Sequence, residues 1–188
     1  SIGDLASSTG VSVPSVSKAV SQLEAHGLVV KHREGVRVAV ELVDRVALAQ
    51  RLATGTGWPG PESLSGYLWG RPVFDVAARL STAADSAEVE LAVTGRGGAA
   101  FVGVLGTTSP TGLRAWVAVG DRSLVDVATA LGLEPAPDEV ANVVLSNDKW
   151  GVGVSRRRDA QFDDLNAWAA HPVRMWCDLH DEQRGAEY

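Results

Sequence analysis

One helix pattern followed at once by a valine-rich hairpin pattern constrains the fold of this chain more than any other feature. Residues 13–25, VPSVSKAVSQLEA, place apolar side chains at helical spacing, at Val16, Ala19, Val20 and Leu23. Gly27 then ends the predicted helix. Residues 28–32 and 36–42 are rich in valine, alternate in polarity and flank the sequence REG, which predicts two antiparallel strands in a hairpin.

A shorter helix is predicted ahead of this one, in residues 1–10, SIGDLASSTG. Ser1 is placed to cap it and Gly10 to end it. We expect three of its side chains to face inward, those of Ile2, Leu5 and Ala6. Ser12 is the expected N-cap of the second helix, and Pro14 falls in its first turn, where a missing N–H costs nothing.

The order helix, tight turn, helix, hairpin is that of a winged helix-turn-helix, and residues 1–29 resemble the core of bacterial winged-helix repressors. The resemblance implies that the second helix and the hairpin bind double-stranded DNA. Such domains usually carry a further helix ahead of these two. We therefore expect the sequence to be part of a longer chain that extends before Ser1 and beyond Tyr188.

The side chains that the apolar stripe leaves outside are the candidate DNA contacts. Small hydroxyls let a helix approach the major groove closely, glutamine can pair with adenine, and lysine or arginine can reach phosphates. The predicted helix contacts are Ser12, Val13, Ser15, Ser17, Lys18, Ser21 and Gln22. The predicted hairpin contacts are Lys31, Arg33 and Arg37. The alternative for both groups is an ordinary solvated surface.

The charge distribution confines any DNA contact to one face of the front segment. The whole chain carries −6, from 17 basic and 23 acidic residues. Residues 1–57 hold six basic and five acidic residues, hence +1, and the remainder holds eleven and eighteen, hence −7. An acidic chain does not bind nucleic acid over its whole surface.

Other counts limit the class of protein. Cys177 is the only cysteine, which excludes an internal disulfide and metal sites built from several cysteines. No apolar run approaches the roughly 18–20 residues that span a bilayer, and residues 1–10 lack the pattern of a signal peptide. We expect a cytoplasmic protein with no membrane contact.

The remainder of the chain predicts a second domain. Residues 44–53 continue as a linking helix, so the first domain is residues 1–54; residues 55–66, dense in Gly and Pro, are the predicted linker, and residues 67–188 the second domain. Its predicted helices are 72–87, 97–106, 123–133 and 163–170. Its predicted strands are 89–95, 113–120, 141–146, 150–155 and 173–180. This mixture predicts an α+β (mixed α/β) class with a central sheet flanked by helices.

No catalytic, cofactor or metal site is expected in this second domain. Residues 95–103, GRGGAAFVG, match neither a dinucleotide fingerprint nor a P-loop and predict a tight strand-to-helix turn instead. No strand offers the D-x-D pair that holds magnesium for nucleotidyl transfer. The four histidines lack metal-ligand spacing. We therefore expect a protein that is not an enzyme.

A second resemblance covers the back of the chain. The stretches ELAVTGRGGAAFVG, LRAWVAVG, VDVATALGL, ANVVLSND and PVRMWCDLHDEQRGAEY are similar to the AbiEi family, the antitoxins of type IV toxin–antitoxin systems and related regulators. The resemblance implies a front domain that represses its own promoter. It also implies a back domain that antagonises a nucleotidyltransferase-like toxin, with or without a stable complex.

Two alternatives to a repressor and antitoxin stay open. In one, the protein is a ligand-responsive winged-helix repressor whose second domain senses a small molecule in a pocket lined by Trp and Val. In the other, the second domain is a nucleotide-handling enzyme, which the missing D-x-D and P-loop disfavour.

Overall fold

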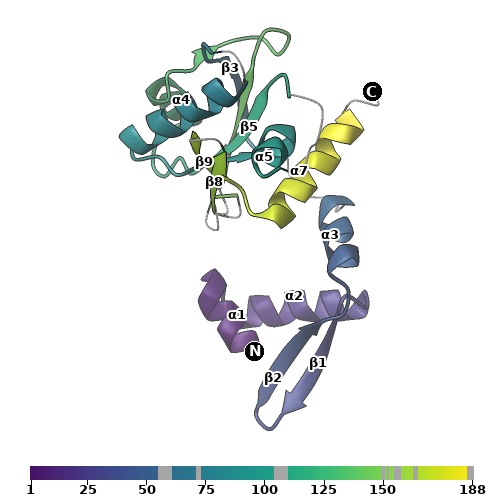
Figure 1. The fold of residues 1–188 in the computed structure, drawn as a ribbon. Coiled ribbons are helices and arrows are strands. Elements are labelled where there is room, and N and C mark those ends of the chain that lie inside the picture. Colours follow the sequence, from purple (N-terminus) through teal and green to yellow (C-terminus); the bar gives the residue numbers. More distant parts are fainter. Residues whose placement is uncertain are drawn as a thin grey trace. The chain divides into compact units, whose positions relative to one another are not determined.

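The computed structural model has mixed α+β architecture, as the sequence predicts, and its chain divides into two compact units, residues 1–54 and 55–188 (Figure 1). The structure describes residues 1–54, 61–70, 73–103, 110–149, 151, 153–154, 158–162 and 165–185. Each unit has a hydrophobic core of its own. Among the described residues, no helix has both the length and the apolar character of a membrane span.

The first unit begins with the two predicted helices. Helix α1 spans Ile2–Thr9, starts at a capping box between Ser1 and Asp4, and ends at Gly10, whose φ of 67° is left-handed. Helix α2 spans Val13–Ala25 and ends ahead of Gly27, which also has a left-handed φ, of 68°. Both glycines adopt backbone angles that side chains with a Cβ avoid, so they explain where the helices stop.

A β-hairpin and a third helix complete this unit. Strand β1, Val29–Glu34, pairs antiparallel with β2, Arg37–Leu42. Glu34 pairs with Arg37, so the turn is Gly35 and Val36 and is shorter than the predicted REG connection. Gly35 supplies the positive φ, of 65°, that such a turn requires. Helix α3, Arg45–Thr54, follows directly.

The core of the first unit lies between α1, α2 and the hairpin. It is built from Ala6, Val16, Val20 and Val29, with Ile2, Leu23 and Val40 packed against them. The predicted inward position of Leu5 is wrong, since its side chain is 38% exposed, and Ala19 of the predicted apolar stripe is exposed as well. The hairpin packs on the side of α2 that carries Val16, Val20 and Leu23.

A mixed sheet organises the second unit. Within the described residues it has seven strands in the order β6-β3-β7-β5-β4-β9-β8. The bounds are β3 Ser63–Tyr67, β4 Leu91–Thr94, β5 Leu113–Val117, β6 Glu134–Pro135, β7 Val143–Asn147, β8 Arg158–Phe162 and β9 Leu165–Ala169. Strand β5 runs parallel to β7 and antiparallel to β4, and β4 runs parallel to β9.

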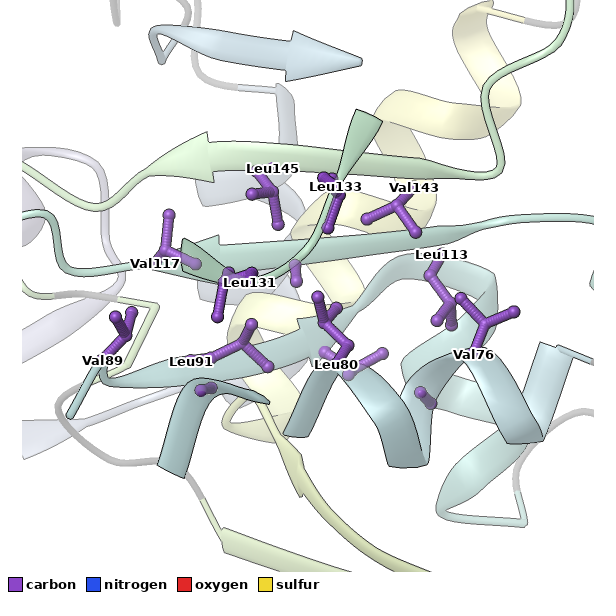
Figure 2. Close-up of a cluster of buried hydrophobic side chains, with 14 of the residues drawn as sticks. Val76, Leu80, Val89, Leu91, Leu113, Val117, Leu131, Leu133, Val143 and Leu145 are labelled. Atoms are coloured by element: carbon purple, nitrogen blue, oxygen red, sulfur yellow. The ribbon is translucent and has the colours of Figure 1, made fainter. Parts of the chain in front are cut away.

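Helices cover both faces of this sheet. They are α4 Val73–Ser86, α5 Gly95–Phe101, α6 Leu124–Ala130 and α7 Pro172–Gly185. Figure 2 shows Leu91 and Leu113 of the central strands beside Leu80 and Val76 of α4, and Leu145 beside Leu133. Successive side chains of a strand point to opposite faces. The alternate residues Thr94, Arg114 and Trp116 therefore face the other side of the sheet, where α7 lies.

Two predicted elements of the second unit are of the wrong type. Residues 163–170 were expected to be helical, but Leu165–Ala169 form β9, which pairs with β8 and, through Ala169, with Val93 of β4. This pairing outweighs the helix preference of the three alanines. Residues 173–180 were expected to be a strand, but they belong to helix α7. The apolar residues Val173, Met175 and Cys177 stand at every second position, a spacing that is typical of a strand.

Two boundaries also differ from the prediction. Strand β3 begins at Ser63, inside the segment assigned to the linker 55–66, because its backbone pairs with β7 despite its Ser and Gly content. The glycine-rich segment forms the expected strand-to-helix turn, but α5 begins at Gly95, two residues earlier than predicted. The predicted strand 150–155 lies partly outside the described residues; Gly151, Gly153 and Val154, which are described, are not in a strand.

Candidate nucleic-acid interface

The outward face of α2 carries most of the predicted helix contacts in exposed positions. Six of the seven are exposed: Ser12, Val13, Ser15, Lys18, Ser21 and Gln22. Ser17 is half-buried. The apolar stripe thus orients this polar face away from the core, and its short side chains leave the helix backbone accessible to a groove.

The N-terminus of α2 is not capped by the side chain that the sequence suggested. Ser12 holds the N-cap position with extended backbone angles, but its hydroxyl makes no capping bond. Instead its Oγ lies 2.9 Å from Oγ of Ser15, in the first helical turn. The first N–H groups of α2 are therefore not satisfied by Ser12 and remain donors toward whatever approaches this end of the helix.

Lys31 does not extend into solvent as a free wing cation. Its Nζ lies 2.7 Å from Oε2 of Glu24 and donates a hydrogen bond of 2.9 Å to Oγ of Ser21. The hydrogen bond from Lys31 lowers the pKa of the Glu24 carboxyl below its usual range. Two predicted contacts, Ser21 and Lys31, are thus brought together, and Glu24, which the sequence analysis did not select, joins them.

The hairpin register separates its basic residues onto two faces. Paired residues share a face and successive residues alternate. The inner face, which holds the core residues, comprises Val29, Lys31, Arg33, Val38, Val40 and Leu42. The outer face includes Val30, His32, Arg37, Ala39 and Glu41. Arg33 and Arg37 are both exposed, but they lie on opposite faces of the ribbon.

The outer face is partly neutralised by its own acid. Nε2 of His32 lies 2.8 Å from Oε2 of Glu41, and both side chains are more than half exposed. An exposed pair of this kind contributes little to stability. It does place the carboxylate of Glu41 on the same face as Arg37. Arg33, which is exposed on the inner face, has fewer acidic neighbours on its own face than Arg37 has.

A second polar cluster lies in the other unit, between α7 and the sheet. Asp178 is 5% exposed. Its Oδ2 accepts hydrogen bonds from Thr94 Oγ1 at 2.6 Å and Trp116 Nε1 at 2.8 Å, and its Oδ1 accepts one from Arg174. The Arg174 guanidinium also stacks on the Trp116 ring, 4.3 Å from its centroid. Every partner of this carboxylate comes from the protein itself.

Glu182 continues the same helix stripe one turn further. The backbone N–H of Arg96 donates to its Oε2 at 3.1 Å, and the guanidinium groups of Arg96 and Arg114 lie 3.9 and 4.0 Å from the carboxylate. Burial raises the pKa of Glu182, with a small further contribution from Asp178, and the Arg96 and Arg114 groups oppose this. A Cβ at Gly95 would lie 1.9 Å from Oε1, so this glycine makes room for the carboxyl.

The sequence analysis missed this cluster because residues 173–180 were taken for a strand. Arg174, Asp178 and Glu182, the α7 charged stripe, recur every four residues, which is the spacing that would have revealed a polar helix face. Most polar groups of the stripe have partners within the unit, although Nε of Arg174 is buried without one. In the part of the chain that the structure describes, no group of three or more acidic, His or Cys side chains could hold a metal ion.

Comparison with known proteins finds no relative of this chain. No family model, no curated protein and no solved structure matches the chain. The similarity to winged-helix repressors and to the AbiEi family therefore stays a prediction from the motifs.

Proposed function

We propose that the protein is a cytoplasmic DNA-binding transcriptional regulator, and that residues 1–54 act as a winged helix-turn-helix. In this proposal α2 enters the major groove and the hairpin contacts the flanking backbone. The observation that carries it is the juxtaposition of a polar, small-residue face on α2 with a basic ribbon built on the same core. An ordinary solvated helix would not need a projecting hairpin beside it.

The charges of the first unit fit a local contact. Lys18 on α2 and Arg33 and Arg37 on the hairpin are exposed cations in a unit that carries little net charge. Phosphate contacts would come from these few side chains and from the first N–H groups of α2. Ser15 and Gln22 would then face the base edges. We expect modest non-specific affinity and a shallow salt dependence, because few phosphates are neutralised.

The test is a titration of the full chain against a fluorescent duplex taken from directly upstream of its own gene. A scrambled duplex of the same composition is titrated beside it, each at two salt concentrations. Tighter, salt-sensitive binding to the upstream duplex supports a sequence-reading regulator. Equal weak binding to both duplexes would contradict it, and the first unit would then be a module that contacts protein.

For the second unit we propose the antitoxin role that the AbiEi resemblance implies. Its support is the set of motifs in the back of the chain, and its partner would be a nucleotidyltransferase-like toxin. The check is co-expression of the protein with the neighbouring gene. Rescue of growth by both the wild-type chain and the Arg33→Ala/Arg37→Ala variant would separate toxin antagonism from DNA binding. A neighbouring gene that is harmless when expressed alone would contradict this role and favour the ligand-responsive repressor.

A further inference from the structure

Beside the apolar contact of Val20 and Leu23 with the hairpin, three polar side chains link the hairpin to the last two turns of α2. We call Ser21, Glu24 and Lys31 the Lys31 clamp. Lys31 comes from β1 and the other two from α2, so the cluster ties two elements separated by the turn at Gly27. The Lys31 side chain is 25% exposed, against 42% for Glu24, so the amine is the more enclosed partner.

We propose that Lys31 is a positioning residue in DNA recognition: it fixes the hairpin against α2 through Glu24 and Ser21 and leaves phosphate contact to other cations. This inference rests on the proposed function, and it changes the role that the sequence suggested for Lys31. The geometry supports it, because two of the three N–H donors of the amine are already directed at protein oxygens.

Electrostatics favours the same assignment. If Lys31 turned to a phosphate, it would leave the Glu24 carboxylate unpaired beside the DNA, where a negative charge is repelled. Paired, the two charges cancel, so the clamp adds nothing to the counterion release that drives non-specific binding. Arg33 lies two residues further along the same inner face. By fixing the hairpin against α2, the clamp therefore also fixes the position of the Arg33 guanidinium relative to that helix.

The clamp also determines what Ser21 offers to a base. An ammonium group has no acceptor, so Ser21 must accept the hydrogen bond from Lys31 with its oxygen. Its own O–H is then left to donate. The second lone pair of its oxygen also stays available, so Ser21 can still donate to or accept from a base edge.

The experiment compares Lys31→Met and Glu24→Gln in the full chain, on the upstream duplex and the scrambled duplex at two salt concentrations. These changes alter the net charge by one unit in opposite directions but break the same contact. We expect both to lower the ratio of specific to scrambled affinity by roughly two- to fivefold, as for a partly exposed ion pair. The salt slope of Lys31→Met should match that of the wild type. The double variant should be no worse than either single variant.

Lys31→Arg provides the conservative rescue. Arginine can still pair with Glu24, so the affinity ratio should return toward that of the wild type. Circular dichroism and the Tm of each variant monitor folding. A fall in Tm with equal loss on both duplexes, and an unchanged ratio, would reduce the clamp to a purely structural contact and overturn the inference.

A phosphate-contacting Lys31 gives the opposite pattern. Lys31→Met would then lower the salt slope by about 0.9, and Glu24→Gln would tighten binding to both duplexes by removing a negative charge. That result overturns the positioning role while leaving the proposed function intact. A wild-type chain that does not distinguish the two duplexes rejects the proposed function itself, and the clamp inference with it.

Discussion

Helices α2 and α7 both carry a polar stripe opposite an apolar one, but the two stripes have different environments. On α2 the polar side chains of Ser15, Lys18 and Gln22 are exposed. On α7, Asp178 accepts hydrogen bonds from Thr94 of β4, Trp116 of β5 and Arg174 of its own helix, and Glu182 accepts one from the N–H of Arg96 in α5. Residue type alone does not separate the two helices. The difference lies in whether partners for the polar groups come from the same unit.

This contrast supports the proposed recognition surface on α2 more directly than charge does. A buried carboxylate with several internal donors contributes mainly to the stability of its unit. An exposed hydroxyl or amide contributes little to stability and keeps its hydrogen-bonding capacity for a partner. The α7 stripe is therefore structural, and the α2 face is the surface where a change should alter binding without altering stability.

The largest effect is expected from Asp178→Ala. It leaves the hydroxyl of Thr94, the indole N–H of Trp116 and the guanidinium of Arg174 without their shared acceptor. We expect the free energy of unfolding to fall by about 3 kcal/mol, as measured by urea denaturation. Gln22→Ala on α2 is the matched change and should leave the midpoint in place. If both variants unfold at the wild-type midpoint, the contrast between the helices is wrong.

Gly95→Ala should have the next largest effect. Gly95 has a φ of 62°, and an added Cβ would also displace the carboxyl of Glu182. We expect a loss of about 2 kcal/mol: about 1 from the left-handed backbone and about 1 from the lost hydrogen bond to the N–H of Arg96.

Gly120→Ala separates these two contributions. Gly120 has a similar φ of 58°, but nothing lies within 4 Å of the position that its Cβ would take. Its alanine variant should therefore lose only the backbone part, about 1 kcal/mol. Equal losses in both variants, measured by thermal and urea unfolding, would show that Glu182 does not depend on the space at Gly95.

The same contrast explains which elements the sequence could predict. In the first unit, the capping residues, the glycines and the apolar periodicity all indicate the same elements. Helices α1 and α2 and the hairpin form where those local signals predict them. In the second unit, Leu165–Ala169 became a strand because a neighbouring strand pairs with it, and the local preference of its alanines indicated a helix. Long-range pairing of this kind has no local signal.

The candidate site was predictable to a similar degree. The exposed face of α2 follows from its apolar stripe, and the residues named there are in place apart from the half-buried Ser17. The ion pair of Lys31 with Glu24 was not predictable, because the two residues are brought together only by the turn between helix and strand. The opposite faces of Arg33 and Arg37 follow from the register, and this depends on the two-residue turn at Gly35 and Val36.

Arg33→Ala and Arg37→Ala should each have an effect of about 1 kcal/mol on DNA binding near 0.15 M salt, through loss of one phosphate contact. A ribbon that meets the backbone edge-on presents both of its faces, so we expect each change to lower the salt slope by about 0.9 and the double variant by about 1.8. The slopes are measured by fluorescence titration at several salt concentrations. Arg122→Ala, which removes the same charge from the second unit, is the control.

A double variant that behaves like Arg33→Ala alone would show that only the inner face of the hairpin touches DNA. No change in affinity or slope in either single variant would remove the hairpin from the interface. In that case the contrast between the helices would still hold for α2, because the exposure of its polar face does not depend on the ribbon.

The smallest effect concerns the acid dependence of the α7 stripe. Burial raises the folded-state pKa of Glu182 above its usual value of 4.5, so the folded chain binds its proton more readily than the unfolded chain. The resulting stabilisation is fully present below the unfolded pKa and is lost as the pH rises through the folded pKa.

Relative to Glu182→Gln, the wild type should therefore gain stability as the pH falls from 7 toward 4.5. Gln keeps an acceptor for the N–H of Arg96, so the comparison isolates the charge. Urea unfolding of both proteins across this range measures the difference. A wild type that instead loses stability relative to the variant on acidification would mean that Arg96 and Arg114 outweigh burial, and that the stripe on α7 is held by its ion pairs.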